Sequence, residues 1–273
     1  MNLILPLSYL FKSRLITTHE KISWIFIYPI FILCAVLIFN GDLINFVVAF
    51  FMTMALYEIG YIDNDFRTTK NEREPTIRYF KGSDWILENY RLAILSRIII
   101  ASLLFIYLIY NINNNKLILL IFFIIILTIG FYLHNTLRSR WNILTYFVII
   151  ASRYLLPAVA SITIPEEPLL IIYLIIIFPL LRTFEHACKV KYKFPNFKRI
   201  IRNPDVFRVK WYLVLELVLC LFIIFIGCDF FLMNIIMLTT YFLSYRIGTL
   251  YLSSTKKVRR NKHKSYNWDS DEQ

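Results

Sequence analysis

The sequence predicts an all-α protein, a polytopic helical bundle that spans a membrane. Of its 273 residues, 58% are hydrophobic and 24 are phenylalanine, and the mean hydropathy is +0.60. Soluble domains have about 45–50% apolar residues. Several runs of more than about 18 residues carry few or no charges, and a helix needs about that length to cross a bilayer. We therefore expect about eight transmembrane helices.

Taken in order along the chain, the apolar runs are separated by links that alternate between short and long. The N-terminal segment, 1–21, is expected to lie at the membrane interface, because its apolar part is too short to span. The eight expected spans are 22–39, 43–62, 92–112, 116–134, 141–161, 168–184, 209–227 and 229–252. We expect residues 1–255 to form a single transmembrane bundle. Residues 256–273 would be a cytoplasmic tail, first basic and then acidic.

The positive charge is concentrated in the long links and the two terminal segments, and is nearly absent from the short links. Of 30 lysines and arginines, Lys116 is in a short link and Arg153 is within a span, whereas the others lie in the N-terminal segment, the long loops with their adjoining helix ends, and the tail. The positive-inside rule then places both termini in the cytoplasm. Topology explains most of the net charge of +12; attraction to anionic lipid and recruitment of a phosphorylated substrate are the alternatives. Nucleic acid is not an expected partner, because no binding motif accompanies the charge.

A cluster of acidic residues begins before the second expected span has ended. Glu58 and Asp65 are seven residues apart, nearly two helical turns, so they share a helix face at a spacing of roughly 10 Å. That spacing is too wide for one metal ion but suits the two sides of a diphosphate with its magnesium ions. Asp63 joins them only if the helix ends near Tyr61. The alternative is a solvated helix end with mixed charges.

A second polar cluster follows the fourth expected span. It runs from Tyr132 to Arg140 and includes Arg138, which could equally be a topology anchor. Arg153 lies about four turns into the next helix. A guanidinium within an apolar span needs an anionic partner or a wet cavity, and Glu216 in the seventh span is one candidate partner.

A third cluster follows the sixth expected span. Arg182 and Glu185 are three residues apart and Glu185 and Lys189 are four apart, so a continuing helix would place all three on one face. They form either part of a binding site or a structural ladder of ion pairs.

With these clusters after the second, fourth and sixth spans, the chain resembles the UbiA-type intramembrane prenyltransferase superfamily over about residues 20–250. That family carries Asn-Asp-x-x-Asp-x-x-x-Asp after its second helix, ending in Arg-Pro, here near Arg73 and Pro75. Anchoring on Pro75 aligns the motif asparagine and its three aspartates, in order, with Tyr57, Glu58, Tyr61 and Asp65. Two of the three acids are therefore kept, and the family's ninth span is missing.

The resemblance is nearest to the branch that transfers phosphoribosyl groups to polyprenyl phosphate. That branch has an acidic element like Arg182 to Glu185 and an arginine in the fifth helix, where Arg153 stands. It implies a polyprenyl lipid substrate, a diphosphate-containing donor, Mg²⁺ as cofactor and the lipid bilayer as surroundings. The implied catalytic residues are Glu58, Asp65 and Glu185, of which Glu58 and Asp65 bind the metal. The implied substrate-binding residues are Asp63, Arg73, Tyr132, Arg138, Arg153, Arg182 and Lys189.

Two alternatives remain. One is conventional transfer of a prenyl group from a prenyl diphosphate to a small acceptor, although the second Asp-rich motif of such enzymes is lost. The other is a non-catalytic lipid-binding protein that keeps the fold, which the tyrosines at motif positions 57 and 61 leave open. In each case we expect an integral protein of the bacterial inner membrane with its active face in the cytoplasm.

Overall fold

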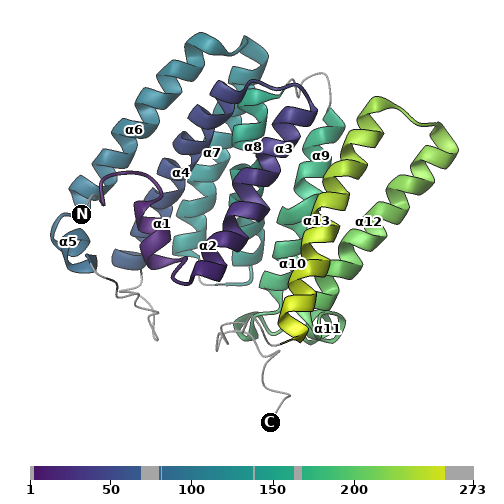
Figure 1. The fold of residues 1–273 in the computed structure, drawn as a ribbon. Helices are drawn as coiled ribbons and strands as arrows, with labels where there is room; N and C mark the ends of the chain where they lie inside the picture. Colours follow the sequence, from purple (N-terminus) through teal and green to yellow (C-terminus); the bar gives the residue numbers. More distant parts are fainter. Residues whose placement is uncertain (1–2, 69–79, 81, 138, 163–167, 256–273) are drawn as a thin grey trace. The chain divides into compact units, whose positions relative to one another are not determined.

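The computed structural model describes residues 3–68, 80, 82–137, 139–162 and 168–255, and every regular element in these ranges is helical (Figure 1). The predicted all-α membrane bundle is confirmed, because seven helices are long and apolar enough to cross a membrane. The chain divides into two compact units, Met1–Ile171 and Ile172–Gln273. The single bundle expected over 1–255 stays a prediction.

The seven membrane-crossing helices match seven of the eight expected spans. They are Thr18–Ile38 (α2, η1 and α3), Leu43–Phe66 (α4), Tyr90–Asn111 (α6), Asn114–Thr136 (α7), Asn142–Ser161 (α8), Pro168–Ala187 (α9, η4 and α10) and Phe230–Ser254 (α13). The eighth expected span falls in α12 (Pro204–Ile226), which has 23 residues but carries Asp205, Arg208 and Lys210 near its start. The short helices are α1 (Ser8–Ser13), α5 (Ser83–Glu88), η5 (Val190–Tyr192) and α11 (Pro195–Ile200).

Polar residues in the short links fix where several of these helices begin. Asp42, Asn113 and Asp229 precede α4, α7 and α13, and each side chain accepts a hydrogen bond from a backbone N–H of the first turn. Thr17 and Glu20 form a reciprocal capping box at the start of α2. The polar residues of these links therefore satisfy free N–H groups of the helices that follow them.

In the first unit, α4 packs against α6, α7 and α8 (Figure 1). The approach to α7 is close at Gly60, where an added Cβ would lie 2.2 Å from the ring of Phe131. That ring also contacts Tyr57 edge-on at 4.8 Å. Asn135 of α7 donates to the Gly60 carbonyl at 3.1 Å. The acidic end of α4 is thus enclosed by its neighbours and is not a solvated helix end.

Two spans contain a π-helical turn at a proline. Phe26–Ile30 surrounds Pro29, and Ile176–Leu180 surrounds Pro179. Proline lacks the N–H that an α-helix would use, so the helix widens locally. In the first of these turns the Ile27 carbonyl accepts a hydrogen bond from the hydroxyl of Tyr154 in α8. The widened turn thereby binds the first span to α8.

In the second unit, aromatic rings join the helices. The Phe242 ring of α13 stacks on Tyr212 of α12 at 5.0 Å and lies 6.1 Å from Phe178 of η4. Tyr173 of α9 hydrogen-bonds to Thr239 of α13 at 3.1 Å. These contacts join α9 and η4 to α13, and α13 to α12.

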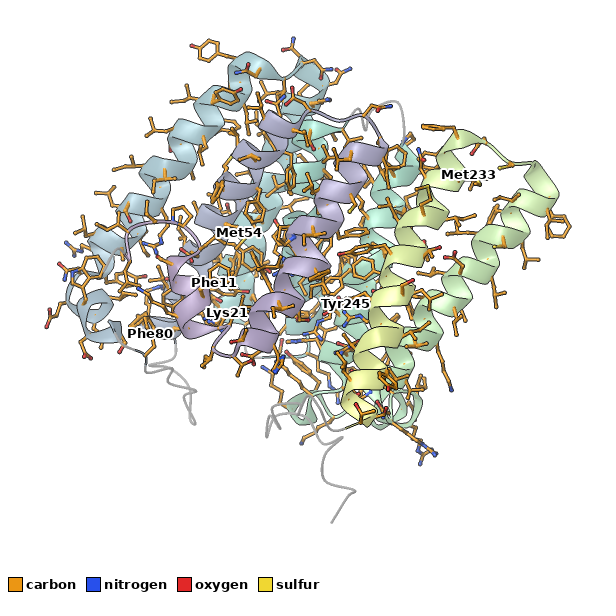
Figure 2. The ribbon with its side chains drawn as sticks, in the orientation of Figure 1. Phe11, Lys21, Met54, Phe80, Met233 and Tyr245 are labelled. Carbon is orange, nitrogen blue, oxygen red and sulfur yellow. The ribbon has the colours of Figure 1, made fainter. Side chains whose placement is uncertain are left out.

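Outward-facing aliphatic side chains cover the long helices (Figure 2). Leu103 on α6 and Ile118 on α7 are 62% and 65% exposed. A soluble protein rarely exposes such continuous apolar faces. We conclude that these faces contact lipid and that the protein is an integral membrane protein.

Candidate functional site

Glu58 is completely buried and is bound by two other elements. Its Oε2 accepts hydrogen bonds from Nε and Nη2 of Arg97 in α6, at 3.2 and 3.1 Å. Its Oε1 accepts the backbone N–H of Leu10 in α1 at 2.8 Å. Both side chains of the Glu58–Arg97 pair have no exposed surface. This carboxylate therefore joins α1, α4 and α6.

Asp65 is occupied in a similar way by the N-terminal segment. Its Oδ1 accepts from Nη2 of Arg14 at 2.6 Å, and its Oδ2 accepts from the hydroxyl of Tyr9 at 2.5 Å. Arg14 also stands over the ring of Tyr61, at 4.4 Å from the centroid. Burial, with the negative charge of Asp65, raises the pKa of the Tyr9 hydroxyl, so this group remains a donor at neutral pH. The N-terminal segment, which was expected at the membrane interface, is thus packed on α4.

Asp63 lies on the same continuous helix, since α4 extends to Phe66, but it faces different partners. It binds Arg67 one turn later at 2.5 Å, accepts from Asn135 at 3.0 Å and accepts from the hydroxyl of Tyr90 at 3.0 Å. Hydrogen bonding to Asp63 raises the pKa of Arg67. Asp63 therefore connects α4 to α6 and α7.

The expected magnesium ligands do not fit a metal ion in this arrangement. Glu58 and Asp65 each have an arginine as partner, and their oxygens accept protein hydrogen bonds. Among the described residues, no group of three or more histidine, cysteine, aspartate or glutamate side chains could bind a metal. A Mg²⁺ ion would have to displace Arg14 or Arg97 before either carboxylate could bind it. The metal remains a prediction from the resemblance.

Arg153 lies deep in α8 and is only 8% exposed. Its guanidinium stands over the rings of Tyr28, Tyr57 and Tyr154, at 4.9, 5.2 and 5.8 Å from their centroids. Its Nε is buried without an acceptor, and no carboxylate pairs with it among the described residues. The rings offset part of the cost of burying the cation. An anion from outside the chain would offset more.

The other predicted residues near this cluster are placed differently. Tyr132 lies on α7 and is 62% exposed. Arg73 and Arg138 lie outside the described residues. Glu216, the candidate partner of Arg153, accepts a hydrogen bond from Thr240 of α13 at 2.6 Å within its own unit.

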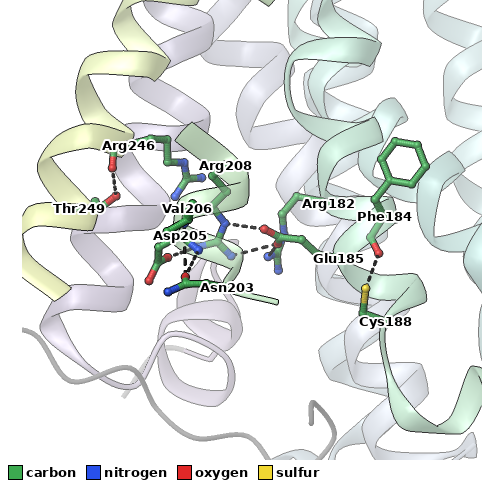
Figure 3. Close-up of polar contacts among 10 residues, drawn as sticks. All are labelled: Arg182, Phe184, Glu185, Cys188, Asn203, Asp205, Val206, Arg208, Arg246 and Thr249. Carbon is green, nitrogen blue, oxygen red and sulfur yellow. Dashed lines mark hydrogen bonds and ion pairs between the residues drawn. The ribbon is translucent and has the colours of Figure 1, made fainter. Parts of the chain in front are cut away.

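In the second unit, Glu185 forms ion pairs with arginines from two helices (Figure 3). One is Arg182, three residues earlier in α10. The other is Arg208 of α12, whose Nε and Nη2 donate to Oε1 and Oε2 at 2.5 and 3.0 Å. Arg208 also binds Asp205 at 2.9 Å. The Arg182–Glu185 pair of the proposed ladder is therefore present, but Glu185 has a second arginine partner, Arg208, which comes from α12.

Lys189 does not continue the ladder along a helix. The α10 helix ends at Ala187, so the spacing of four residues no longer places Lys189 above Glu185 on one face. The backbone N–H of Lys189 instead donates to the His186 carbonyl at 3.2 Å in the turn that closes the helix. The expected alignment of the three charges is wrong for this residue.

Five residues of these clusters were not predicted: Tyr9, Arg14, Arg97, Arg208 and Arg246. Arg97 pairs with Glu58 across 39 residues of sequence, a separation at which spacing carries no signal. Arg246 could have been noticed in the sequence, because it lies within the expected span 229–252, six residues before its end. It is 5% exposed, and its Nε is buried without an acceptor.

No family model, curated protein or solved structure matches this chain. The assignment of function therefore depends on the geometry of its charged residues and on the resemblance of its motifs.

Proposed function

We propose that this protein is a UbiA-like membrane transferase that acts on a polyprenyl phosphate. The observation that carries the proposal is Arg153, a buried guanidinium within a span that has aromatic neighbours but no carboxylate among the described residues. A phosphate on a membrane lipid supplies the missing negative charge, and its apolar tail suits the surrounding helices. Orientation with both termini in the cytoplasm of a bacterium belongs to the same proposal, supported by the charge of the long loops.

The proposed donor is phosphoribosyl diphosphate. A phosphate oxygen of the lipid would attack the anomeric carbon of the ribose, and the bond from that carbon to the diphosphate would break, so that the diphosphate leaves with the electron pair. Arginines would stabilise the charge that develops on the leaving group. Each unit by itself holds such groups, Arg153 in the first and Arg182 in the second. Glu58 and Asp65 are bound by arginines here, so neither carboxylate is free to hold a magnesium ion for this step.

A second candidate function, lipid binding without catalysis, is favoured by the ion pairs of the carboxylates on α4. If Glu58, Asp63 and Asp65 serve only to join helices, the chain is a lipid-binding protein that keeps the architecture without the chemistry. Each of these carboxylates has a cationic partner within the first unit. This candidate shares the Arg153 site with the transferase but predicts no turnover.

An assay of purified protein separates these candidates. Polyprenyl phosphate is offered with phosphoribosyl diphosphate, and in parallel a prenyl diphosphate is offered with small aromatic acceptors. We expect release of diphosphate only in the first mixture. The variant Arg153→Gln should lose the activity, whereas Arg91→Gln, which removes an exposed guanidinium from α6, should keep it. Turnover only with the prenyl diphosphate would contradict the proposal, and no turnover in either mixture would favour the lipid-binding candidate.

A further inference from the structure

Arg246 is a buried charge of the second unit for which the described residues provide no ion pair. It lies in α13, eight residues before the helix ends at Ser254, or about 12 Å into the helix. Its side chain is 5% exposed and extends from α13 toward Arg208 (Figure 3). Its Nε is buried without an acceptor, and its guanidinium lies over the ring of Tyr245, 5.2 Å from the centroid.

The carboxylates nearby are already engaged. Both oxygens of Glu185 accept hydrogen bonds from Arg208, and Oε2 is shared with Arg182. Asp205 binds the remaining terminal nitrogen of Arg208. Three guanidiniums therefore lie near two carboxylates. Arg208 repels Arg246, and Glu185 attracts it but is already paired with Arg182 and Arg208. Burying an uncompensated charge in this way is costly unless a further anion is present.

A second polar group lies at this place. The hydroxyl of Tyr212 is buried beside Arg246 and close to Glu185, and it forms no well-aligned hydrogen bond. Tyr212 follows Arg208 by four residues in α12, so the two share a helix face. Arg246 Nε and the Tyr212 hydroxyl are thus two buried polar atoms near Arg208 whose hydrogen bonding is incomplete.

We infer that Arg246, Arg208 and Tyr212 form a binding site for a phosphate group, either a phosphomonoester or a diphosphate. A phosphomonoester brings several acceptor oxygens and up to two negative charges, and a diphosphate brings more of both. Either group matches two guanidiniums and a hydroxyl better than a single carboxylate does. Glu185 is a positioning residue in this site, because it fixes the planes of Arg182 and Arg208 from the opposite side.

The binding of phosphate here does not depend on the proposed reaction. Identifying the occupant as the diphosphate of the donor does rest on the proposed function. The same chemistry could come from a soluble diphosphate or from a lipid headgroup, and a binding experiment distinguishes the two without requiring turnover.

The test is the thermal unfolding of full-length protein in detergent, with and without inorganic pyrophosphate, and separately in nanodiscs with and without phosphatidic acid. Pyrophosphate should raise the Tm if the source is soluble, and phosphatidic acid should raise it if the source is a lipid headgroup. In Arg246→Gln the apparent Kd should increase at least about ten-fold, because a charge-assisted hydrogen bond is lost. Arg246→Lys keeps the charge but not the planar guanidinium, and its apparent Kd should lie between those of the natural protein and Arg246→Gln.

The matched control is Lys210→Gln, which removes an exposed charge from α12 and should leave binding unchanged. Without ligand, Arg246→Gln should unfold at the same temperature as the natural protein or higher, because it removes a buried charge that repels Arg208. The inference is overturned if neither ligand raises the Tm of the natural protein. It is also overturned if Arg246→Gln lowers the Tm, or fails to fold, while Arg246→Lys keeps the full response to ligand, because Arg246 would then be structural.

Discussion

Glu58 and Arg97 form an ion pair between α4 and α6 in which neither side chain has any exposed surface, with 3.1 Å between Oε2 and Nη2. Arg97 also donates to the Ala93 carbonyl at 3.0 Å, and Glu58 accepts the backbone N–H of Leu10. Each charge therefore has a backbone hydrogen-bond partner in addition to the ion pair, as a buried pair requires. The first acid of the degenerate motif has a structural partner that the family motif does not imply.

Breaking this pair should destabilise the protein. Removal of one partner leaves an uncompensated buried charge, which costs about 3–5 kcal/mol. We expect Glu58→Gln and Arg97→Met each to lower the free energy of unfolding in detergent by that order, and the double variant to recover part of the loss. Glu88→Gln, an exposed change in α5, is the control. If both single variants keep the natural Tm, Glu58 is free for another role and the structural interpretation is wrong.

The hydrogen bond from Tyr9 to Asp65 should decide whether α1 stays on α4. Tyr9→Phe removes a bond to a charged group, worth about 1.5–3 kcal/mol. Asp65→Asn also removes the ion pair with Arg14. We expect faster hydrogen exchange across residues 8–14 in both variants, with the larger effect in Asp65→Asn. Asp84→Asn, in an exposed position of α5, should leave these rates unchanged. Equal protection of α1 in all three variants would show that the two hydrogen bonds do not fix it.

The helices could be predicted from the sequence because their signals are local. Apolar runs gave seven spans, and the caps at Asp42 and Asn113 lie in the links that separate them. The acidic face of α4 was also predicted, since Glu58 and Asp65 do lie on one helix.

The partners of those charges could not be predicted, because they come from distant segments. Arg97 was counted with the basic ends of helices, although it lies two turns inside α6 and is completely buried. Lys189 was placed on a helix face that ends two residues earlier, at Ala187. Arg208 was part of a basic stretch in the sequence, and only the packing of α10 on α12 shows that it binds Glu185.

Magnesium gives a direct test of the motif carboxylates. Because Glu58 and Asp65 are bound by arginines, Mg²⁺ alone should leave the Tm of the purified protein unchanged up to about millimolar concentrations, with Ca²⁺ as a parallel control. A rise with Mg²⁺ that disappears in Asp65→Asn would contradict the pairing with Arg14 and support the metal site that the resemblance implies.

The topology depends on whether α12 crosses the membrane. Reporter fusions after Gly41 and Asn113 should report the outside, and a fusion after Lys193 should report the inside. If α12 is the eighth span, a fusion after Gly227 should report the outside, because the apolar part of the helix separates it from Lys193. The same location for Lys193 and Gly227 would show that α12 does not cross and that the termini lie on opposite sides.

The central claim is that Arg153 binds the phosphate of a polyprenyl lipid, and a comparison of two ligands tests it most directly. Native mass spectrometry or Tm titration would measure the affinity for a polyprenyl phosphate and for the polyprenol with the same tail. We predict that the natural protein prefers the phosphate by at least about ten-fold, that Arg153→Gln binds both ligands equally, and that Arg91→Gln keeps the preference. Equal affinity of the natural protein for both lipids, or an undiminished preference in Arg153→Gln, would contradict the account.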